Sequence, residues 1–396
     1  MARIRPRTLA AAAAFLTAAT SLPSQTKVPL TKPAAEFAEG FTRVTAIREL
    51  PSGKVIVVDQ MDKIVQLVDL AAGTAQKIGR EGNGPGEYSL PSTVLGLPDG
   101  SSLVLDMLNR RLLTISPDGK PGAFLELPRP PATQGGGGGP RMMIGGMDMR
   151  GTDLQGRLYY QGAPFSIETG ATFDSVAILR WDRVNPKLDT VGYVKLPPSS
   201  VQTGGGQGNF RVQIGGQKVF TPAEVWAVAG DGRIARVTPM PYRVIWMDGA
   251  TKAAGPVQSY TPIKVTEADK ELVREARRRQ RPMVISMGAG GASSGPPPGG
   301  SVQVPEPEFE ETMPPFTGGV GTGGSVLATP EGEVWVLRTR PASDKIPSYD
   351  VFDRTGALVK KVQLNPNSRV VGFGKGTVYV VRTDDDDLQY LQRYVR

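Results

Sequence analysis

One local pattern occurs six times along the chain: a turn that ends in glycine, followed at once by a run of mostly apolar residues. The first two copies read LPSGKVIVVD around Gly53 and LPDGSSLVLD around Gly100. The other four are centred on Gly156, Gly232, Gly332 and Gly376. Glycine tolerates the positive φ that tight hairpin turns need, and Val, Ile, Leu and Tyr favour the strand that follows. The pattern therefore predicts six β-hairpins.

The spacing of these glycines predicts the architecture. They lie 47, 56, 76, 100 and 44 residues apart, and the shortest spacings match one four-stranded propeller blade of about 40–50 residues. We therefore expect an all-β, six-bladed β-propeller. The first unit predicts strands at 44–50, 54–60, 64–70 and 74–79, and the fourth predicts strands at 224–229, 233–238, 242–247 and 256–261.

The last unit is one strand short. Only three strands, at about 369–373, 377–382 and 388–395, precede the end of the sequence. A propeller that lacks one strand is commonly closed by a strand from the other end of the chain, which removes two exposed sheet edges. We expect part of 27–41 to supply the missing strand.

Composition excludes several kinds of chemistry. The 49 Gly and 35 Pro residues disfavour a helical bundle, and the chain contains no Cys and no His. Disulfides, thiolate nucleophiles, zinc sites built from Cys or His, and Ser-His-Asp triads are therefore excluded.

The first two dozen residues are typical of a secretory signal peptide. Arg3, Arg5 and Arg7 precede an apolar or small stretch at 9–19, which is too short for a spanning helix of about 20 residues. We expect residues 1–24 to be a signal peptide, a mature chain that begins between about 20 and 26, and a periplasmic or secreted monomer without a membrane span. Removing the three arginines lowers the formal net charge from +8 to +5, which indicates no particular partner.

Three insertions lengthen connections between units, at 128–146, 197–220 and 262–324. Each joins the fourth strand of one unit to the first strand of the next, so all three should decorate one face of the propeller. Loops on a rigid scaffold commonly carry function, although Gly-rich insertions are also used as flexible padding.

The insertion at 262–324, within a propeller domain at 25–396, has internal structure. Thr266 and Asp269 can cap a helix that runs to about Gln280. Its basic second half could form a lid for an anionic partner, or it could be a solvated helix paired with nearby glutamates. The stretch 286–304 is of low complexity, so we expect its deletion to leave the fold intact.

Two segments carry a family resemblance. DMLNRRL at 106–112, followed by ISPDG at 115–119, resembles the NHL-type repeat, and YDVFDRTG at 349–356 resembles its second half. IGREGNGPGEY at 78–88 is similar to the connector of exported bacterial six-bladed β-propeller proteins. The resemblance implies the propeller fold. It leaves function open, because such propellers include adhesion and sensor modules as well as lyases and hydrolases.

Counting six residues on from each repeat glycine reaches the loop-side end of each second strand. These positions hold Asp59, Asp106, Gly162, Thr238, Arg338 and Arg382. Because the sixth unit neighbours the first, the order around the ring is Arg338, Arg382, Asp59, Asp106. The aspartates could cap their own loops, or the four side chains could form a dipolar ligand pocket near the axis.

Two other segments have mainly structural interpretations. The connector residues Gly82, Gly84, Pro85, Gly86, Glu87 and Tyr88 lack the spacing of a phosphate or dinucleotide loop. We expect them to shape the crossing from the first unit to the second, with Tyr88 packed between the two. The acidic run 384–387 could hold Ca²⁺, but consecutive carboxylates cannot all face one ion, so a solvated turn is favoured.

We therefore expect an exported binding or scaffold protein that recognises a protein or a small anionic or dipolar ligand on the face carrying the insertions. We expect no nucleic-acid partner and no resident cofactor. The alternative is a metal- or carboxylate-dependent lyase or hydrolase of the NHL-like propeller type. The absence of His counts against that alternative, because His is the commonest acid–base residue.

Overall fold

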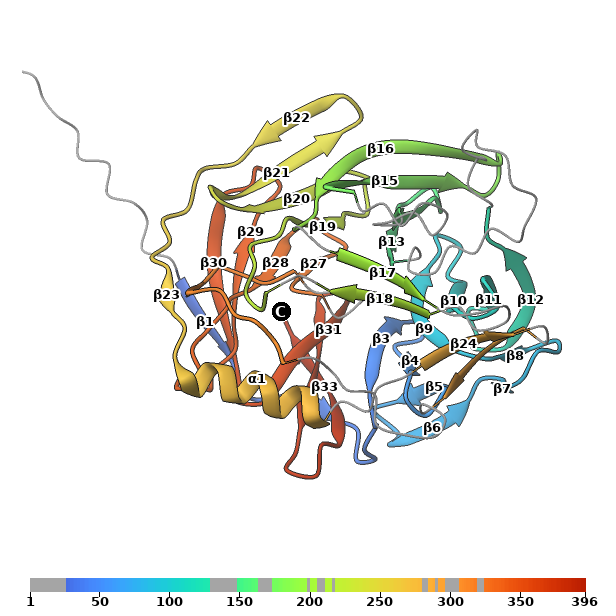
Figure 1. Ribbon diagram of the computed structural model, residues 1–396. Helices are drawn as coiled ribbons and strands as arrows, with labels where there is room; N and C mark the ends of the chain where they lie inside the picture. Colours follow the sequence, from blue (N-terminus) through green and yellow to red (C-terminus); the bar gives the residue numbers. More distant parts are fainter. Residues whose placement is uncertain are drawn as a thin grey trace, which may run out of the picture.

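Six four-stranded antiparallel sheets form a ring, which confirms the six-bladed β-propeller (Figure 1). The computed structural model describes residues 26–128, 148–162, 173–197, 200–204, 211–215, 218–279, 284–288, 291–295, 306–318 and 324–396. The expected signal peptide, most of the 128–146 insertion and much of 286–304 lie outside the described residues.

The first three blades follow the chain in order. Blade 1 contains β3 (Val44–Glu49), β4 (Val55–Asp59), β5 (Ile64–Asp69) and β6 (Thr74–Lys77). Blade 2 contains β9 (Pro91–Gly96), β10 (Ser102–Asp106), β11 (Arg111–Ile115) and β12 (Pro121–Glu126). Blade 3 contains β13 (Asp148–Thr152), β14 (Leu158–Gln161), β15 (Ser175–Asp182) and β16 (Lys187–Lys195).

The other three blades complete the ring. Blade 4 contains β19 (Val225–Val228), β20 (Ile234–Pro239), β21 (Tyr242–Asp248) and β22 (Thr251–Ala254). Blade 5 contains β27 (Val326–Ala328), β28 (Val334–Leu337), β29 (Ser348–Phe352) and β30 (Leu358–Leu364). Blade 6 contains β31 (Ser368–Gly374), β32 (Thr377–Thr383) and β33 (Gln389–Val395), with β2 (Ala35–Glu36) as its outer strand.

The core is divided among the six junctions between blades. The second strands are buried on both faces, which is why VIVVD and SLVLD read as continuous rather than alternating apolar runs. Each junction holds its own hydrophobic cluster; the cluster between blades 6 and 1, for example, joins Val371 and Val381 to Val55 and Val57. Each blade is thus held by both of its neighbours.

The N-terminal segment closes the ring, as expected. Ala35 and Glu36 pair antiparallel with Arg393 and Gln392 of β33, and Phe37 is buried against blade 6. The structure adds a contact that the sequence interpretation missed. β1 (Thr26–Leu30) pairs parallel with β30 as a fifth strand of blade 5. One short segment therefore covers the outer edges of two neighbouring blades.

One predicted strand is wrong. The fourth strand of blade 4 is β22 (Thr251–Ala254), not 256–261. Asp248 pairs with Thr251, and Gly249 takes a φ of 56°, so a two-residue hairpin loop begins directly after Asp248. The chain then stays beside β21 without forming a regular strand: the Gly255 and Gln258 amides donate to the carbonyl oxygens of Val244 and Tyr242 before the insertion begins.

The insertion is anchored at both ends. β23 (Ile263–Lys264) pairs with β26 (Thr312–Met313), and between them α1 (Glu267–Arg279) begins at the expected cap, where Thr266 and Asp269 exchange hydrogen bonds. Arg274 of the helix forms an ion pair with Glu306 at 3.2 Å. Two further hairpins, β17 (Ser200–Gly204) with β18 (Arg211–Gly215) and β24 (Val284–Gly288) with β25 (Gly291–Gly295), also belong to the insertions. The ion pair of Arg274 with Glu306 agrees with the interpretation of α1 as a solvated helix paired with nearby glutamates.

Because tyrosines are buried between the blades, we expect the fold to lose stability at high pH. Burial raises the pKa of Tyr349 and of Tyr159 to about 12, whereas the group in an unfolded chain has a pKa near 10. The folded state therefore holds these protons more tightly. Its stability should be fully present below pH 10 and should fall as pH rises from 10 towards 12.

Urea unfolding at pH 8, 10 and 11.5 measures this effect. Lysines titrate over the same range, so the Tyr349→Phe variant is the control: its stability should fall less steeply than that of the parent chain. Equal pH dependence of stability in the two proteins would contradict a raised pKa of Tyr349 in the folded state.

Candidate functional site

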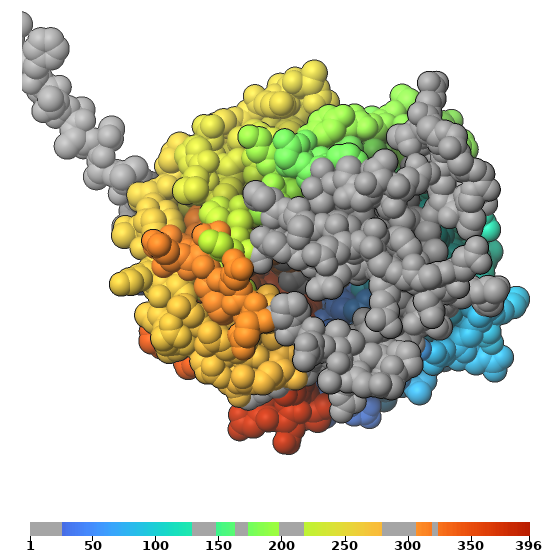
Figure 2. Space-filling view, viewed as in Figure 1, coloured from blue at the N-terminus to red at the C-terminus, as the bar shows by residue number. Residues whose placement is uncertain are grey.

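The innermost strands define the two faces of the molecule. We call the face at which β3, β9, β13, β19, β27 and β31 begin the loop face, because it receives the connections that carry the insertions. Figure 1 views this face, with β17, β18, β24 and α1 in front of the blades. Figure 2 shows a hollow near its middle, with blue atoms from the beginning of the described chain at its base.

Two arginines lie near the junction of blade 6 with blade 1 on this face. Arg369 is the second residue of β31, and its guanidinium donates to the carbonyl oxygen of Val44 at the start of β3. It also donates to Gln389 Oε1 at 3.2 Å, and the same oxygen accepts the Val44 amide at 2.9 Å. Arg43, directly before β3, lies close enough for its charge to act on Arg369. The two side chains belong to opposite ends of the sequence.

A third arginine approaches from blade 5. The Tyr349 hydroxyl accepts the Val370 amide at 3.0 Å, and the charges of both Arg369 and Arg340 act on this tyrosine. Arg340 itself donates to the carbonyl oxygen of Asp344 at 3.1 Å. We call Arg43, Arg340 and Arg369 the arginine cluster. It spans blades 5, 6 and 1.

The described part of the chain supplies no ion-pair partner to the cluster. No described carboxylate forms an ion pair with Arg43, Arg340 or Arg369, and Glu168 is the single acidic residue of 38 that lies outside the described residues. Burial lowers the pKa of Arg369; Tyr349 acts in the opposite direction, and the charge of Arg43 again lowers the pKa. An anion bound here would compensate both lowering effects.

The four residues predicted from the second strands each have other partners. Asp59 is 3% exposed and accepts the amides of Thr42 at 2.7 Å and Arg43 at 3.1 Å. Burial raises the pKa of this carboxyl, and its backbone hydrogen bonds lower it. Asp59 therefore fixes the backbone of Arg43, a member of the cluster.

Asp106 holds a second network. It is fully buried and accepts from the Leu90 amide at 3.0 Å, Asn109 Nδ2 at 2.7 Å and Arg111 Nε at 3.2 Å. Arg111 continues to the carbonyl oxygen of Glu87. The D-x-x-N-x-R segment thus ties blade 2 to the connector in front of it.

Arg338 and Arg382 lie in separate ion pairs. Arg338 donates to Asp350 at 2.6 Å and lies 5.0 Å from the ring centres of both Tyr242 and Tyr260. Arg382 contacts Glu36 of the closing strand at 3.3 Å. No hydrogen bond or ion pair joins any two of Asp59, Asp106, Arg338 and Arg382, all of which are described. Their common pocket stays a prediction.

The connector at 78–88 packs closely where the chain crosses from blade 1 to blade 2. β7 (Arg80–Glu81) pairs parallel with β8 (Glu87–Tyr88), and Glu87 accepts the Gly84 amide at 2.8 Å. Gly82 has a φ of 153°, and a Cβ there would overlap the Glu87 carboxylate. Tyr88 is 1% exposed between blades 1 and 2, and its hydroxyl accepts the Val65 amide at 3.0 Å. Pro85 and Gly86 complete the turn.

Other candidate features are weaker. Asp384 of the acidic run accepts the amides of Asp386 and Leu388. Within the described ranges no three carboxylates converge as a metal site would require, and no helix is long and apolar enough to cross a membrane.

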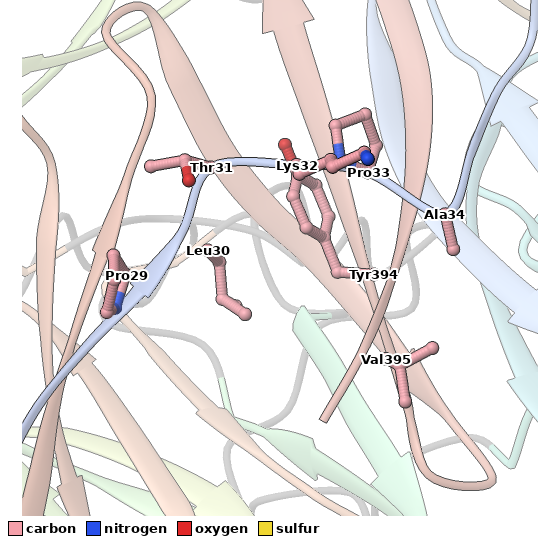
Figure 3. Close-up of a pocket in the computed structure, with 8 residues that line it drawn as sticks. All are labelled: Pro29, Leu30, Thr31, Lys32, Pro33, Ala34, Tyr394 and Val395. Carbon is pink, nitrogen blue, oxygen red and sulfur yellow. The ribbon is translucent and has the colours of Figure 1, made fainter.

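A shallow pocket of about 330 Å³ lies between the segment 29–34 and the end of β33, with Lys32 as its charged residue (Figure 3).

The sequence interpretation missed the arginine cluster because it examined the ends of second strands. Arg43 precedes the first strand of blade 1, and Arg369 is the second residue of the first strand of blade 6. The same counting applied to first strands would have placed both at the axis. Their proximity also depends on closure of the ring, which brings residues 43 and 369 together.

Comparisons with known proteins describe shape only. No protein-family model and no curated protein matches the chain. Among solved structures it is similar to a calcium-binding protein, regucalcin, from Agrobacterium tumefaciens (11% identity, 93% of this chain and 95% of that one, TM-score 0.42). It is also similar to a candidate exported protein of Bacteroides fragilis (11%, 94% and 100%, 0.46) and to virginiamycin B lyase from Staphylococcus aureus (9%, 92% and 99%, 0.37). Nothing about ligand or activity follows from these similarities.

Proposed function

We propose that this chain is an exported binding propeller that holds an anionic ligand on its loop face, at the axial end of blades 5, 6 and 1. The observation that supports the proposal is the arginine cluster: the Arg369 guanidinium donates to the carbonyl oxygen of Val44, the residue after Arg43, and neither arginine has an ion-pair partner among the described residues. Buried and half-buried charges in proteins are normally paired.

The positions of the two guanidinium groups suit recognition of an anion. Arg369 is held by Val44 and Gln389, and the backbone of Arg43 is held by Asp59, so both side chains start from fixed points. Guanidinium groups form short, charge-assisted hydrogen bonds to carboxylate and phosphate oxygens. The same like-charge repulsion that disfavours the empty cluster is relieved when an anion binds.

Neutralising either arginine should weaken binding. Losing a charge-assisted contact to a partly desolvated anion costs about 1.5–3 kcal/mol, which is roughly ten- to 150-fold in affinity. We expect this loss for Arg43→Gln and for Arg369→Gln, measured by isothermal titration with inorganic phosphate and with a panel of small carboxylates.

A matched arginine elsewhere provides the control. Arg180 pairs with Asp189 at 2.9 Å on the outer strands of blade 3, so Arg180→Gln should leave the affinity unchanged. Equal affinities for the parent chain, Arg43→Gln and Arg369→Gln would contradict the proposal. The alternative function, a metal- or carboxylate-dependent lyase or hydrolase, stays a prediction. Among the described residues we identify no catalytic site for it.

A further inference from the structure

The loop that joins β28 to β29 on the loop face is held at two points by the insertion that precedes blade 5. The Thr339 amide donates to the carbonyl oxygen of Pro315 at 3.1 Å, and the Ala342 amide donates to Asp269 Oδ1 at 2.6 Å. Arg340, a member of the arginine cluster, lies between these two attachments in the sequence. Its position therefore depends on how both attachments are fixed.

The Pro315 attachment is anchored in the propeller core. Phe316, the next residue, is fully buried in the cluster between blades 4 and 5, and its ring centre lies 5.7 Å from that of Tyr242. The Ala342 attachment instead depends on the first turn of α1, because Asp269 belongs to that turn. The loop thus has one attachment to the core and one to the helix.

Asp269 uses both of its carboxylate oxygens. The residue is buried; Oδ1 accepts the Ala342 amide, while Oδ2 accepts the amide and the hydroxyl of Thr266 at 2.7 and 2.6 Å. Burial acts to raise the pKa of this carboxyl, but the hydrogen bonds from Thr266 and Ala342 outweigh burial and lower the pKa. The carboxylate is therefore ionised at neutral pH, and hydrogen bonds to an ionised acceptor are stronger than those to a neutral one.

A turn links this attachment to the guanidinium of Arg340. The Asp344 amide donates to the carbonyl oxygen of Pro341 at 2.9 Å, which closes a turn with Ala342 inside it. The carbonyl oxygen of Asp344 accepts from Arg340 Nε at 3.1 Å. Because Asp269 holds Ala342, it holds the turn that directs the guanidinium. Among the described residues the terminal nitrogens of Arg340 form no hydrogen bond, so they can donate to an anion.

We infer that Asp269 is a positioning residue for the proposed anion site: through Ala342 it fixes the turn that directs the Arg340 guanidinium, and it thereby couples α1 to ligand binding. The inference rests on the proposed function, because Arg340 belongs to the arginine cluster. Coupling of this kind is reciprocal. If the helix strengthens anion binding, a bound anion must also strengthen the attachment of the helix.

Phosphate titration of Asp269→Ala tests the inference. The affinity for inorganic phosphate, measured by isothermal titration well below the melting temperature, should fall roughly three- to tenfold, which corresponds to the net contribution of about one hydrogen bond. Ala342→Pro removes the donor of the same hydrogen bond, because proline has no backbone N–H, and should have a similar effect. Either variant can serve if the other fails to fold.

Thr266→Val is the matched control. It removes the hydroxyl that donates to Asp269 Oδ2 but leaves Oδ1 able to accept the Ala342 amide. This variant should weaken the helix cap, and so lower the melting temperature, while the phosphate affinity stays unchanged. A loss of affinity that merely follows a loss of stability would appear in Thr266→Val as well.

A double-mutant cycle shows whether Asp269 acts through Arg340. Asp269→Ala should have no further effect on phosphate affinity in the Arg340→Gln background, because the group that it positions is already absent. In protein labelled with ¹⁵N-arginine, the Nε–H resonance of Arg340 should shift in ligand-free Asp269→Ala and not in Thr266→Val. Hydrogen exchange of the α1 amides should slow when phosphate binds the parent chain, and should slow less in Asp269→Ala.

Any of four results would overturn the inference. With phosphate still bound by the parent chain, these are unchanged affinity in both Asp269→Ala and Ala342→Pro, an equal loss in Thr266→Val, and full additivity of Asp269→Ala with Arg340→Gln. The fourth, which needs no ligand, is an Arg340 resonance that does not move in Asp269→Ala. Absence of phosphate binding by the parent chain would instead contradict the proposed function, and this inference with it.

Discussion

Replacing Asp350 with alanine is expected to lower the free energy of unfolding by about 3–5 kcal/mol, because it breaks a buried ion pair from one side. Asp350 is 2% exposed and accepts from Arg338 at 2.6 Å and from the Tyr242 hydroxyl at 2.9 Å. The variant would leave the Arg338 charge between two tyrosine rings without its carboxylate. Urea unfolding of the parent and the variant measures the loss.

A double variant separates the cost of an unpaired charge from the value of the pair. Replacing both partners of a buried pair with apolar groups is often nearly neutral, so Arg338→Met/Asp350→Ala should be more stable than Asp350→Ala alone. A single variant within 1 kcal/mol of the parent would contradict this description. Arg338 should accordingly affect stability, whereas the sequence analysis considered it as one of four side chains that could form a ligand pocket.

Asp106→Ala should also be strongly destabilising, by about 3 kcal/mol or more. It removes the acceptor for the buried Leu90 amide, where an unsatisfied donor costs about 1–3 kcal/mol, and it leaves Arg111 without its carboxylate. The connector in front of blade 2 loses its attachment at the same time. Thermal and urea unfolding should both report the change.

The Asp106→Ala variant also distinguishes a structural role of Asp106 from a role in ligand binding. Because Asp106 is fully buried in its own network, anion affinity measured well below the melting temperature should be unchanged. Asp59→Ala is the informative comparison, since Asp59 also holds the backbone of Arg43. It should lower both stability and affinity. Reduced affinity in a fully folded Asp106→Ala protein would restore Asp106 as a ligand-contacting residue.

The architecture was predictable because its signals are local. Gly53 and Gly100 take φ angles of 80° and 85° at the expected turns, and the second strands after them are continuous apolar runs. Closure by the N-terminal segment followed from counting strands. The fourth strand of blade 4 was misplaced because Asp248 and Gly249 were not identified as a hairpin turn.

Two features were not predictable because they depend on distant pairing. β1 pairs with β30, more than 300 residues later, and its five residues carry no hairpin signal. The arginine cluster likewise forms only when blade 6 meets blade 1. Counting along the repeat placed Asp59 and Asp106 at the expected strand ends, but their partners are backbone amides and neighbouring side chains that spacing alone does not identify.

Anomalous diffraction from crystals soaked in selenate tests the central proposal most directly. Selenate has the shape and charge of an oxoanion and scatters anomalously, so its position is found without reference to any activity. The account predicts a peak between the guanidinium groups of Arg43 and Arg369, within hydrogen-bonding distance of both, and its loss in Arg43→Gln/Arg369→Gln crystals. A fully occupied anion elsewhere on the loop face, with no density between these two arginines, would contradict it.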